Sequence, residues 1–416
     1  MDKKVDGASL DAAAEAARPL SRVIVLLFAA ASGLAVANAY FAHPLLDVMA
    51  DDLGLARSHA GLIVALTQVG YGLGLILLVP VGDLVDRRKL VAGQSLLSVV
   101  ALVTIGLATS GAMLLAAMAV MGFLAVVTQA LVAYAVTLAR PAERGAVVGT
   151  VTSGIVIGIL LARTVAGTVT DLASWRMVYL GSALVTFVIA LLLYRILPAQ
   201  RSALRLSYPR LVGSLFTLLR DEPTLRIRAL IAMLIFANIT TLLTPLVLPL
   251  SVPPFSLSHT AIGLFGLAGV GGALGASRAG RWTDRGLGQR VTGIALALML
   301  VAWLPIALLP HSILWLILGV ILIDFGLQAV HVTNQGMIYR TRPEAQSRLT
   351  AIYMVFYSIG SAIGSSSSTF AYAHGGWLGV SLLGAGISVA TLVFWAMTLR
   401  TTPASATQAV AACPAE

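Results

Sequence analysis

The hexapeptide Gly82-Asp-Leu-Val-Asp86-Arg87 returns 198 residues later as Gly280-Arg-Trp-Thr-Asp284-Arg285, with Gly, Asp and Arg at the same spacing. Each copy ends a long apolar run that is rich in glycine. The residues before these runs repeat as well, because Ser58-His59 precedes the first and Ser258-His259 precedes the second. We interpret the chain as a tandem duplication that has since diverged.

The composition places both repeats in a membrane. Of the 416 residues, 58% are hydrophobic and 11% are charged, and the mean hydropathy is +0.94. Soluble proteins average about 45–50% apolar and about 25% charged residues. A helix of roughly 20 apolar residues crosses a bilayer. We therefore predict an all-α membrane protein with twelve spans, at residues 23–48, 59–80, 91–109, 112–138, 145–170, 175–197, 229–250, 260–279, 291–309, 312–338, 350–371 and 377–398.

The basic residues predict how these spans are oriented. Lys and Arg prefer the cytoplasmic ends of spans and the short loops there. If residue 1 is cytoplasmic, 24 of the 27 Lys and Arg residues fall in cytoplasmic segments, while Arg57 and Arg176 lie outside and Arg163 lies within a span. The formal charge of +10 then reflects contact with acidic lipid headgroups, and we expect no nucleic-acid partner. We predict a bacterial cytoplasmic membrane protein with both termini inside.

The spans divide into two halves of six. Parallel repeats of this kind place a substrate site near the membrane midplane, where the halves meet. Leu211, Leu215 and Leu218 recur at helical spacing in the basic segment between the halves, which indicates either a short amphipathic helix on the membrane surface or a flexible linker. The predicted parts are a cytoplasmic tail at 1–22, an N-terminal bundle at 23–197, a cytoplasmic linker at 198–228, a C-terminal bundle at 229–398 and a cytoplasmic tail at 399–416.

With these features the chain resembles the major facilitator superfamily. The signature loop of that family reads roughly Gly-x-Leu-Ala-Asp-Arg-x-Gly-Arg-Lys, and the segment from Gly82 to Lys89 is similar to it but lacks the second glycine. Within the family, the resemblance is to bacterial drug:proton antiporters. Their fifth-helix motif is similar to Gly149, Gly158 and Gly167, with Arg163 at the position of the motif's proline. The resemblance implies two bundles around a central cavity lined by helices one, four, seven and ten.

The repeated loops are candidate gates. A carboxylate at the inner end of span two can face the amino-terminal end of span eleven, where free N–H groups and the helix dipole favour negative charge. Asp86 is the candidate for this contact, and by symmetry Asp284 would address the start of span five. The alternative is that both are solvated loop charges of little energetic value. The complete predicted gating loops comprise Gly82, Asp86, Arg87, Gly280, Asp284 and Arg285.

The polar residues of span ten form the strongest candidate site. Asp324, Gln328, His331 and Gln335 recur at intervals of four, three and four residues and share one helical face, with Asn334 at its edge. An ionisable group inside a span is costly and usually marks a transport pathway. We predict that Asp324 and His331 carry protons. The alternative is a structural cluster that joins span ten to a neighbour.

Other polar residues are candidates for the cavity wall. Arg163 could bind an acidic substrate, pair with Asp324 or extend to the outer surface. On span one, Tyr40, His43 and Asp47 point one way. The predicted cavity is mostly apolar, which favours amphipathic organic substrates. Its predicted polar residues are Asn38, Tyr40, His43, Gln129, Tyr134, Asn238, Gln328, Asn334, Gln335, Tyr353 and Tyr357.

These features predict a transporter, with proton-coupled efflux of a small organic molecule as the leading function. Uptake by symport or facilitated diffusion is the alternative, and a transport-inactive membrane receptor is a third. We expect no enzyme, because no Ser/His/Asp set, metal cluster or phosphate loop is evident. The single cysteine, Cys413, excludes disulfides and cysteine-based metal sites. We expect no cofactor, and the predicted partners of this monomer are its substrate, protons and lipid.

Overall fold

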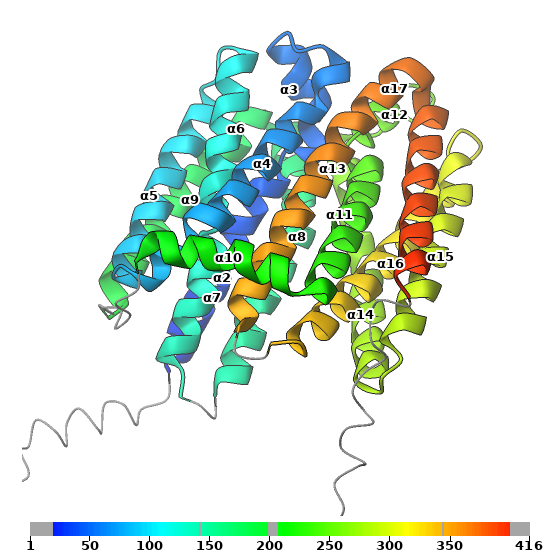
Figure 1. Cartoon of the computed structure of the whole chain (residues 1–416). Coiled ribbons are helices and arrows are strands. Elements are labelled where there is room, and N and C mark those ends of the chain that lie inside the picture. Colours follow the sequence, from blue (N-terminus) through cyan, green and yellow to red (C-terminus); the bar gives the residue numbers. More distant parts are fainter. Residues whose placement is uncertain (1–19, 141–142, 199–206, 343–344, 400–416) are drawn as a thin grey trace, which may run out of the picture.

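The computed structural model describes residues 20–140, 143–198, 207–342 and 345–399, and the regular structure within them is helical (Figure 1). Its N-terminal half comprises α2 (Arg22–Tyr40), η1 (His43–Leu45), α3 (Leu46–Asp52), η2 (Arg57–His59), α4 (Gly61–Leu77), η3 (Val79–Asp83), α5 (Arg87–Gly106), α6 (Gly111–Ala125), α7 (Val127–Leu138), α8 (Arg144–Leu172) and α9 (Trp175–Ile196). The connecting helix is α10 (Tyr208–Asp221). The C-terminal half comprises α11 (Pro223–Leu243), α12 (Val247–Leu250), α13 (His259–Leu264), η4 (Phe265–Ala268), α14 (Gly269–Asp284), α15 (Gly288–Ala307), α16 (Ile313–Tyr339) and α17 (Gln346–Thr398).

The elements form twelve crossings in two six-helix bundles of similar construction. Ten helical runs in the described residues are long and apolar enough to cross a bilayer. One of them, α17, has 53 residues and would extend about 80 Å if straight, so it supplies two crossings. Its reversal lies at Gly376, whose φ of 57° is a left-handed conformation that glycine adopts readily. The remaining crossing is the interrupted run α13–η4–α14. The twelve crossings together confirm the predicted fold.

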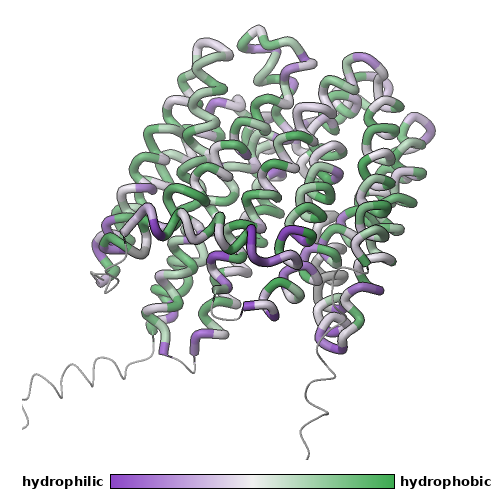
Figure 2. Tube along the Cα trace, viewed as in Figure 1, coloured by the Kyte–Doolittle hydropathy of each residue, from purple (hydrophilic) through white to green (hydrophobic). Residues whose placement is uncertain are grey.

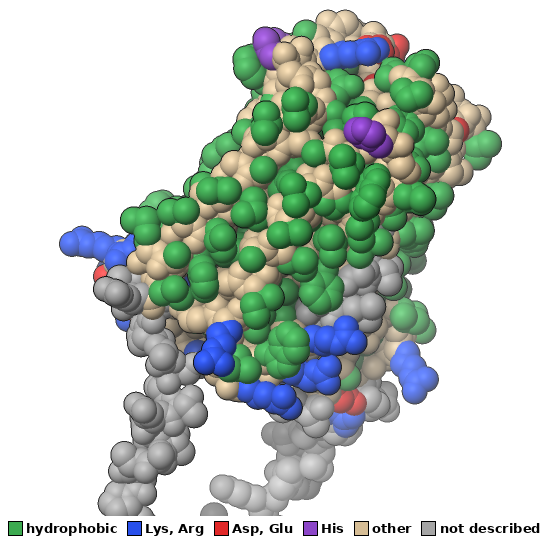
Figure 3. Space-filling model, turned by 90° about the vertical axis from the view of Figure 1, so that its right-hand side faces the viewer, with side chains coloured by type: hydrophobic (Ala, Val, Ile, Leu, Met, Phe, Trp, Pro, Cys, Tyr) green, Lys and Arg blue, Asp and Glu red, His purple; other side chains and the backbone are tan. Residues whose placement is uncertain are grey.

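The two ends of the bundle differ in charge. We call the end that carries α3 and α12 the upper end, and the end crossed by α10 the lower end, as oriented in Figure 1. The body between them is predominantly hydrophobic, and hydrophilic residues concentrate at the ends and along α10 (Figure 2). On the face shown in Figure 3, Lys and Arg side chains gather mainly at the lower end. This asymmetry is the one that the loop arginines predicted.

The connecting segment contains an amphipathic helix, which decides between the two predicted alternatives. Leu215 and Leu218 of α10 are buried against α11, α16 and α17, while the Tyr208 hydroxyl donates to the Leu77 carbonyl of α4 at 2.9 Å. Helix α10 therefore contacts both halves at the lower end. The next helix, α11, begins at Pro223 and so extends into the predicted linker. The predicted tails lie almost entirely outside the described residues.

Glycines allow neighbouring helices to cross closely, as expected where apolar burial gives little net drive for association. A β-carbon at Gly158 or Gly154 of α8 would overlap the backbone of α2 at Gly33 or Ala29. Gly360 and Gly364 of α17 approach α11 at Met233 and Ala237 in the corresponding way. The first and fifth crossings of each half thus share one packing mode.

A second repeated contact ties the first crossing of each half to its sixth. Ser182 donates to Oδ1 of Asn38 at 2.5 Å, and in the other half Asn238 donates to Ser388 at 2.6 Å. Asn238 also accepts from the Trp303 indole at 3.1 Å. These contacts correct the prediction that Asn38 and Asn238 line the substrate cavity, because their amides bond inside their own halves.

We expect Asn238→Ala to lower the thermal stability of the purified protein. The substitution leaves the buried Trp303 indole and Ser388 hydroxyl without this partner, at a cost of about 1–3 kcal/mol for each unsatisfied group. Thermal unfolding in detergent measures the loss. Thr104→Ala is the control, because that hydroxyl bonds only to the Val100 carbonyl of its own helix. Equal melting temperatures for the two variants would contradict the expected role of Asn238.

Candidate functional site

The halves are joined at the upper end by a carboxylate set on the start of a helix. Asp171 of α8 accepts hydrogen bonds from the backbone N–H of His259 at 3.1 Å and of Thr260 at 2.8 Å, and from the Thr260 hydroxyl at 2.6 Å. The imidazole of His259 lies 3.1 Å from Asp171 and 3.2 Å from Asp47 of α3. We call Asp47, Asp171 and His259 the upper latch.

The latch favours protonated His259, which precedes the predicted span 260–279. Hydrogen bonding to Asp47 raises the pKa of His259 above its ordinary value, and Asp171 acts in the same direction while burial opposes both. A protonated imidazole donates from both ring nitrogens. One side chain from the C-terminal half can therefore bridge two carboxylates of the N-terminal half.

A neutral contact corresponds to the latch at the pseudo-symmetric position. The Thr369 hydroxyl of α17 donates to the Ser58 carbonyl at 3.0 Å and accepts from the Gly61 N–H at 3.3 Å. A β-carbon at Gly61 would overlap the Ser365 backbone. The repeated Ser-His dipeptides noted in the sequence therefore mark the two upper contacts between the halves.

The halves diverge toward the lower end. Gly167 and Gly149 lie 18 residues apart on α8, which at 3.6 residues per turn places them on the same helical face. A β-carbon at Gly167 would overlap the His259 backbone of α13, whereas no neighbouring heavy atom lies within 4 Å of that position at Gly149. The face of α8 that touches the other half above is thus uncovered below.

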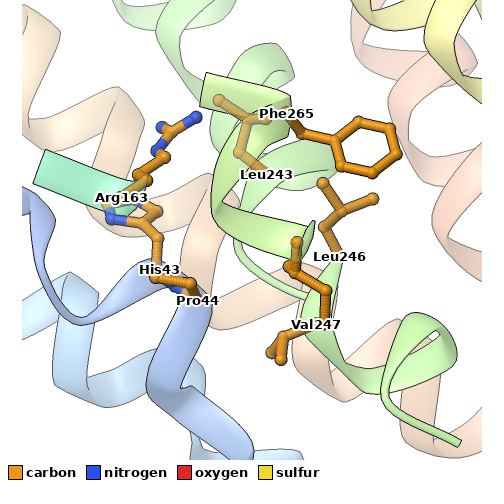
Figure 4. A pocket seen from close by; sticks show the side chains of 8 residues that line it. His43, Pro44, Arg163, Leu243, Leu246, Val247 and Phe265 are labelled. Carbon is orange, nitrogen blue, oxygen red and sulfur yellow. The ribbon is translucent and has the colours of Figure 1, made fainter. Parts of the chain in front are cut away.

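Arg163 lies between the halves, one helical turn from Gly167 on α8. Its guanidinium carbon is 5.9 Å from the centre of the Tyr40 ring, and its Nε is buried without a hydrogen-bond partner. Arg163 and His43 face residues of α11, α12 and η4 across a small cavity of about 10 Å³, which has room for about one water molecule (Figure 4). The side chain points into the molecule, which excludes the alternative that it extends to the surface. The cavity residues are His43, Pro44, Arg163, Leu243, Leu246, Val247, Ile262 and Phe265.

Asp324 lies near the middle of α16, against the start of α14. A β-carbon at Gly272 would overlap its carboxylate and the Gln328 side chain, so a larger residue there would displace them. Asp324 interacts electrostatically with Arg163, but no ion pair within 4.0 Å joins them, and one Asp324 oxygen is buried without a hydrogen-bond partner. Two opposite charges thus face the central region without direct pairing.

Tyrosines extend this central site across the interface. The hydroxyls of Tyr40 and Tyr357 lie 2.6 Å apart, one from each half, and the Tyr40 ring stacks on His43 with centroids 5.5 Å apart. Gln129 donates to the Tyr71 hydroxyl at 3.4 Å. The structure therefore brings together four of the predicted site residues, Arg163, Tyr40, His43 and Tyr357, beside Asp324.

Comparison with known proteins agrees with this architecture. The profile of the Major Facilitator Superfamily matches residues 26–326 and 229–412. The chain belongs to the major facilitator superfamily. A putative uncharacterized transporter, YgaY of Escherichia coli K12, is 46% identical over 376 residues, which is 90% of this chain and 95% of that one. A probable transporter of Streptomyces coelicolor, SCO4007, is 31% identical over 86% of this chain and 84% of its own length.

Solved structures share the fold at low sequence identity. The nucleoside transporter NupG matches with a TM-score of 0.75 and 15% identity over 90% of this chain and all of that one. A bacterial homologue of the human lysosomal transporter Spinster matches with a TM-score of 0.74 and 14% identity over 91% of this chain and 97% of that chain. The family match and the 46% identical transporter relative show that this major facilitator protein is a multi-pass membrane transporter.

The signature loops of this major facilitator protein make contacts within their own halves. Asp86 accepts from the Arg88 N–H at 2.9 Å and caps α5, and Arg87 donates to the Ala133 carbonyl of α7 at 3.0 Å. Asp284 pairs with Arg340 at 3.2 Å. A contact of Asp86 with span eleven, or of Asp284 with span five, stays a prediction for a conformation closed at the lower end. Gly82, Gly280 and Arg285 lie in the same two segments.

Several predicted cavity residues are instead internal to one half. The Tyr134 hydroxyl donates to the Pro198 carbonyl, and its ring packs on Phe28. Asn334 is fully buried and accepts from Arg228 at 3.3 Å. Both corrections have one cause: a helix in a bundle has several buried faces, and its own half covers some of them. Gln335 of the predicted stripe is partly buried on the same helix as Asn334.

His331 is engaged by a partner of its own. Its Nδ1 lies 3.0 Å from the Tyr353 hydroxyl, and its ring packs edge-on against Phe236 with centroids 5.3 Å apart. His331 and Tyr353 therefore form a pair between α16 and α17. A shared proton path from Asp324 to His331 stays a prediction.

Sequence reasoning missed two charged groups. The sequence shows His259 only as part of a repeat, because its position at a helix start opposite Asp171 depends on the fold. Arg228 was assigned to the linker, yet its side chain is 1% exposed and donates to Thr292 at 3.2 Å. The signal for Arg228 was its place directly before an apolar run, within the helix that begins at Pro223.

Proposed function

We propose that this protein carries a small organic molecule across a bacterial inner membrane by alternating access of its central site to the two sides. The observation that carries the proposal is that the halves are joined at the upper end, whereas the same face of α8 is uncovered at the lower end. Alternating access requires one end to be closed while the other is open. We take the lower, arginine-rich end as cytoplasmic, with both termini there and the protein acting as a monomer.

We further propose that the signature loops form the complementary closure. When the lower end closes, Asp86 would approach the start of span eleven and Asp284 the start of span five. Asp171 supports this chemistry, because it already binds the start of α13 in the same manner at the upper end. Each end of the transporter would then close by a carboxylate on a helix start from the other half.

The proposed driving force is proton flow through Asp324, and the proposed direction is efflux. An intramembrane carboxylate with a hydrogen-bonding deficit is suited to gain and lose a proton. The fifth-helix resemblance to drug:proton antiporters supports efflux. Compounds that are less toxic to a strain overexpressing the chain, and more toxic to a matched deletion strain, would be its substrates.

Asp324→Asn is expected to abolish proton-driven accumulation and to spare exchange. Proteoliposomes with an acidic interior should accumulate such a compound through the wild-type antiporter, because protons leaving drive it in. The Asn variant cannot carry the proton, although substrate counterflow should remain. Asp221→Asn, an exposed position on α10, is the control. Undiminished accumulation by Asp324→Asn would remove this residue from the coupling.

Uptake by proton symport is the second candidate, and the separation of Arg163 from Asp324 favours it. An anion bound at Arg163 would leave the Asp324 charge less compensated, so substrate and proton would bind together. An interior more alkaline than the outside would then drive accumulation. The same proteoliposomes with the reversed gradient distinguish the two directions. A receptor without transport predicts no flux under either gradient.

A further inference from the structure

We propose that Arg163 anchors the carboxylate, or an equivalent anionic group, of a small organic acid whose apolar body contacts the apolar wall opposite it. The inference rests on the proposed transport function and specifies the class of its substrate. It assigns the central cavity to an anion rather than to the cationic or neutral compounds that drug efflux would suggest.

The first support is that the Arg163 guanidinium lacks a close counterion and its Nε lacks a hydrogen-bond partner. The Nε atom of Arg163 is buried without a partner, and no carboxylate of the described residues lies within 4.0 Å of the side chain. A buried charge without a close counterion is costly. Arginine presents planar paired donors that match a carboxylate in bidentate geometry. An anionic ligand would therefore satisfy what the protein leaves open.

The second support is how the Arg163 side chain is fixed. Tyr40 lies beside the guanidinium at 5.9 Å from its ring centre, and the Tyr40 hydroxyl meets Tyr357 of the other half. An aromatic ring attracts the cation but accepts no strong hydrogen bond in the guanidinium plane. The arginine is thus oriented by its neighbours while its N–H groups remain free for a ligand.

The third support is the wall opposite Arg163. Leu243, Leu246 and Phe265 face it across the cavity, and Pro44, Val247 and Ile262 complete the apolar lining. An inorganic anion would leave this wall without contacts. In this conformation the cavity has room for about one water molecule, about 10 Å³, so the walls must move apart for a ligand to contact them. A small monocarboxylate with a short hydrocarbon or aryl body requires the smallest such movement.

The position of Asp324 argues against a cation in the same cavity. Its carboxylate is packed against Gly272 of α14, and Asp324 is not among the residues that line the cavity. A cation in the cavity would face Arg163 directly. Charge therefore selects an anion on the Arg163 side, whereas Asp324 remains available for a proton.

The test measures binding of probe acids to the purified full-length protein by isothermal titration calorimetry in detergent at neutral pH. The probes are monocarboxylates from propionate to 3-phenylpropionate, with the amide and the amine of each carbon skeleton as isosteric controls. We expect the acids to bind at least about tenfold more tightly than their amides. We expect the amines to bind more weakly still. Amines that bind best, or no acid that binds, would overturn the proposal.

Variants connect the binding to the residue. Arg163→Gln should bind the acids at least about tenfold more weakly than the wild type, and Arg163→Lys should retain part of the affinity. Asp221→Asn, an exposed position on α10, should bind them as the wild type does. Equal affinities in Arg163→Gln and wild type would contradict the assignment. If Arg163→Gln fails to fold, Leu246→Phe tests the same cavity by size, since it should exclude phenylpropionate before propionate; unchanged affinities for both acids would equally contradict it.

Binding and transport separate the two proposals. Acids that bind through Arg163 but never cross a proteoliposome membrane would sustain the anion site and refute transport. Transport of neutral or cationic compounds without any carboxylate binding would refute the anion site and sustain transport.

Discussion

Replacing Gly167 by Leu is expected to hold the upper end open and to abolish transport. At the crossing of α8 and α13, a β-carbon on this residue would overlap the His259 backbone. Backbone cannot move aside as a flexible side chain can, so the halves must separate there. A cysteine at Leu246, in the central cavity, reports the opening. We expect membrane-impermeant maleimide to label it from the upper side in the variant and poorly in the wild-type background.

Gly149→Leu is the matched comparison, on the same face of the same helix. No neighbouring atom lies within 4 Å of its β-carbon position, so the observed conformation should accept the substitution. Transport should nevertheless be lost, because the added side chain would obstruct closure of the lower end. Labelling at position 246 should then favour the lower side. Normal transport by Gly149→Leu would show that this face of α8 is not covered during the cycle.

Asp171→Ala is expected to shift the protein away from the conformation that is closed at the upper end. The carboxylate accepts two backbone and two side-chain contacts from His259 and Thr260. Hydrogen bonds to charged groups contribute about 1.5–3 kcal/mol each, so removing several changes the equilibrium by at least about tenfold. Distance distributions between spin labels on α3 and α12 would report the opening. Asp51→Ala, an exposed neighbour paired only with Arg57, is the control.

The same latch makes upper closure dependent on pH. The raised pKa of His259 belongs to the closed conformation, in which its charge meets Asp47 and Asp171. The stabilisation is therefore complete below the ordinary histidine pKa of about 6.5 and is lost as pH rises through the raised value. We expect the upper-closed population to grow as pH falls through the raised pKa of His259 toward about 6.5. His259→Gln should remove this dependence; an unchanged pH profile would exclude His259 as its source.

The bundle architecture was predictable because lipid imposes simple rules on sequence. Apolar length, arginine placement and the repeated Gly-x-x-x-Asp-Arg loops each depend on short segments or on counting, so they identify the spans without knowledge of their packing. The repeat also predicted that Asn38 and Asn238 correspond. Their true role needed the fold, since a polar group on a helix can serve its own half as readily as the cavity.

The central site was predicted only in part for the same reason. Arg163 and Asp324 stood out because charges within spans are rare, and both lie near the interface. Their separation could not be read from spacing, because it depends on how α8, α14 and α16 are placed across two halves. The contact between the latch residues was not predicted, although Asp47 and His259 were noted separately. Asp47, Asp171 and His259 come from three separate elements, and none is unusual at a helix end.

The interruption of the eighth crossing by η4 has a mechanical consequence. Above it, the short helix α13 is fastened to the N-terminal half through Asp171; below it, α14 packs with α16 of the C-terminal half. The 3-10 geometry of Phe265–Ala268 has weaker hydrogen bonds than an α-helix and therefore bends at lower cost. This short stretch can bend beside Arg163 and Asp324. Ligand binding or protonation at these two residues could then move α13 and open or close the upper latch.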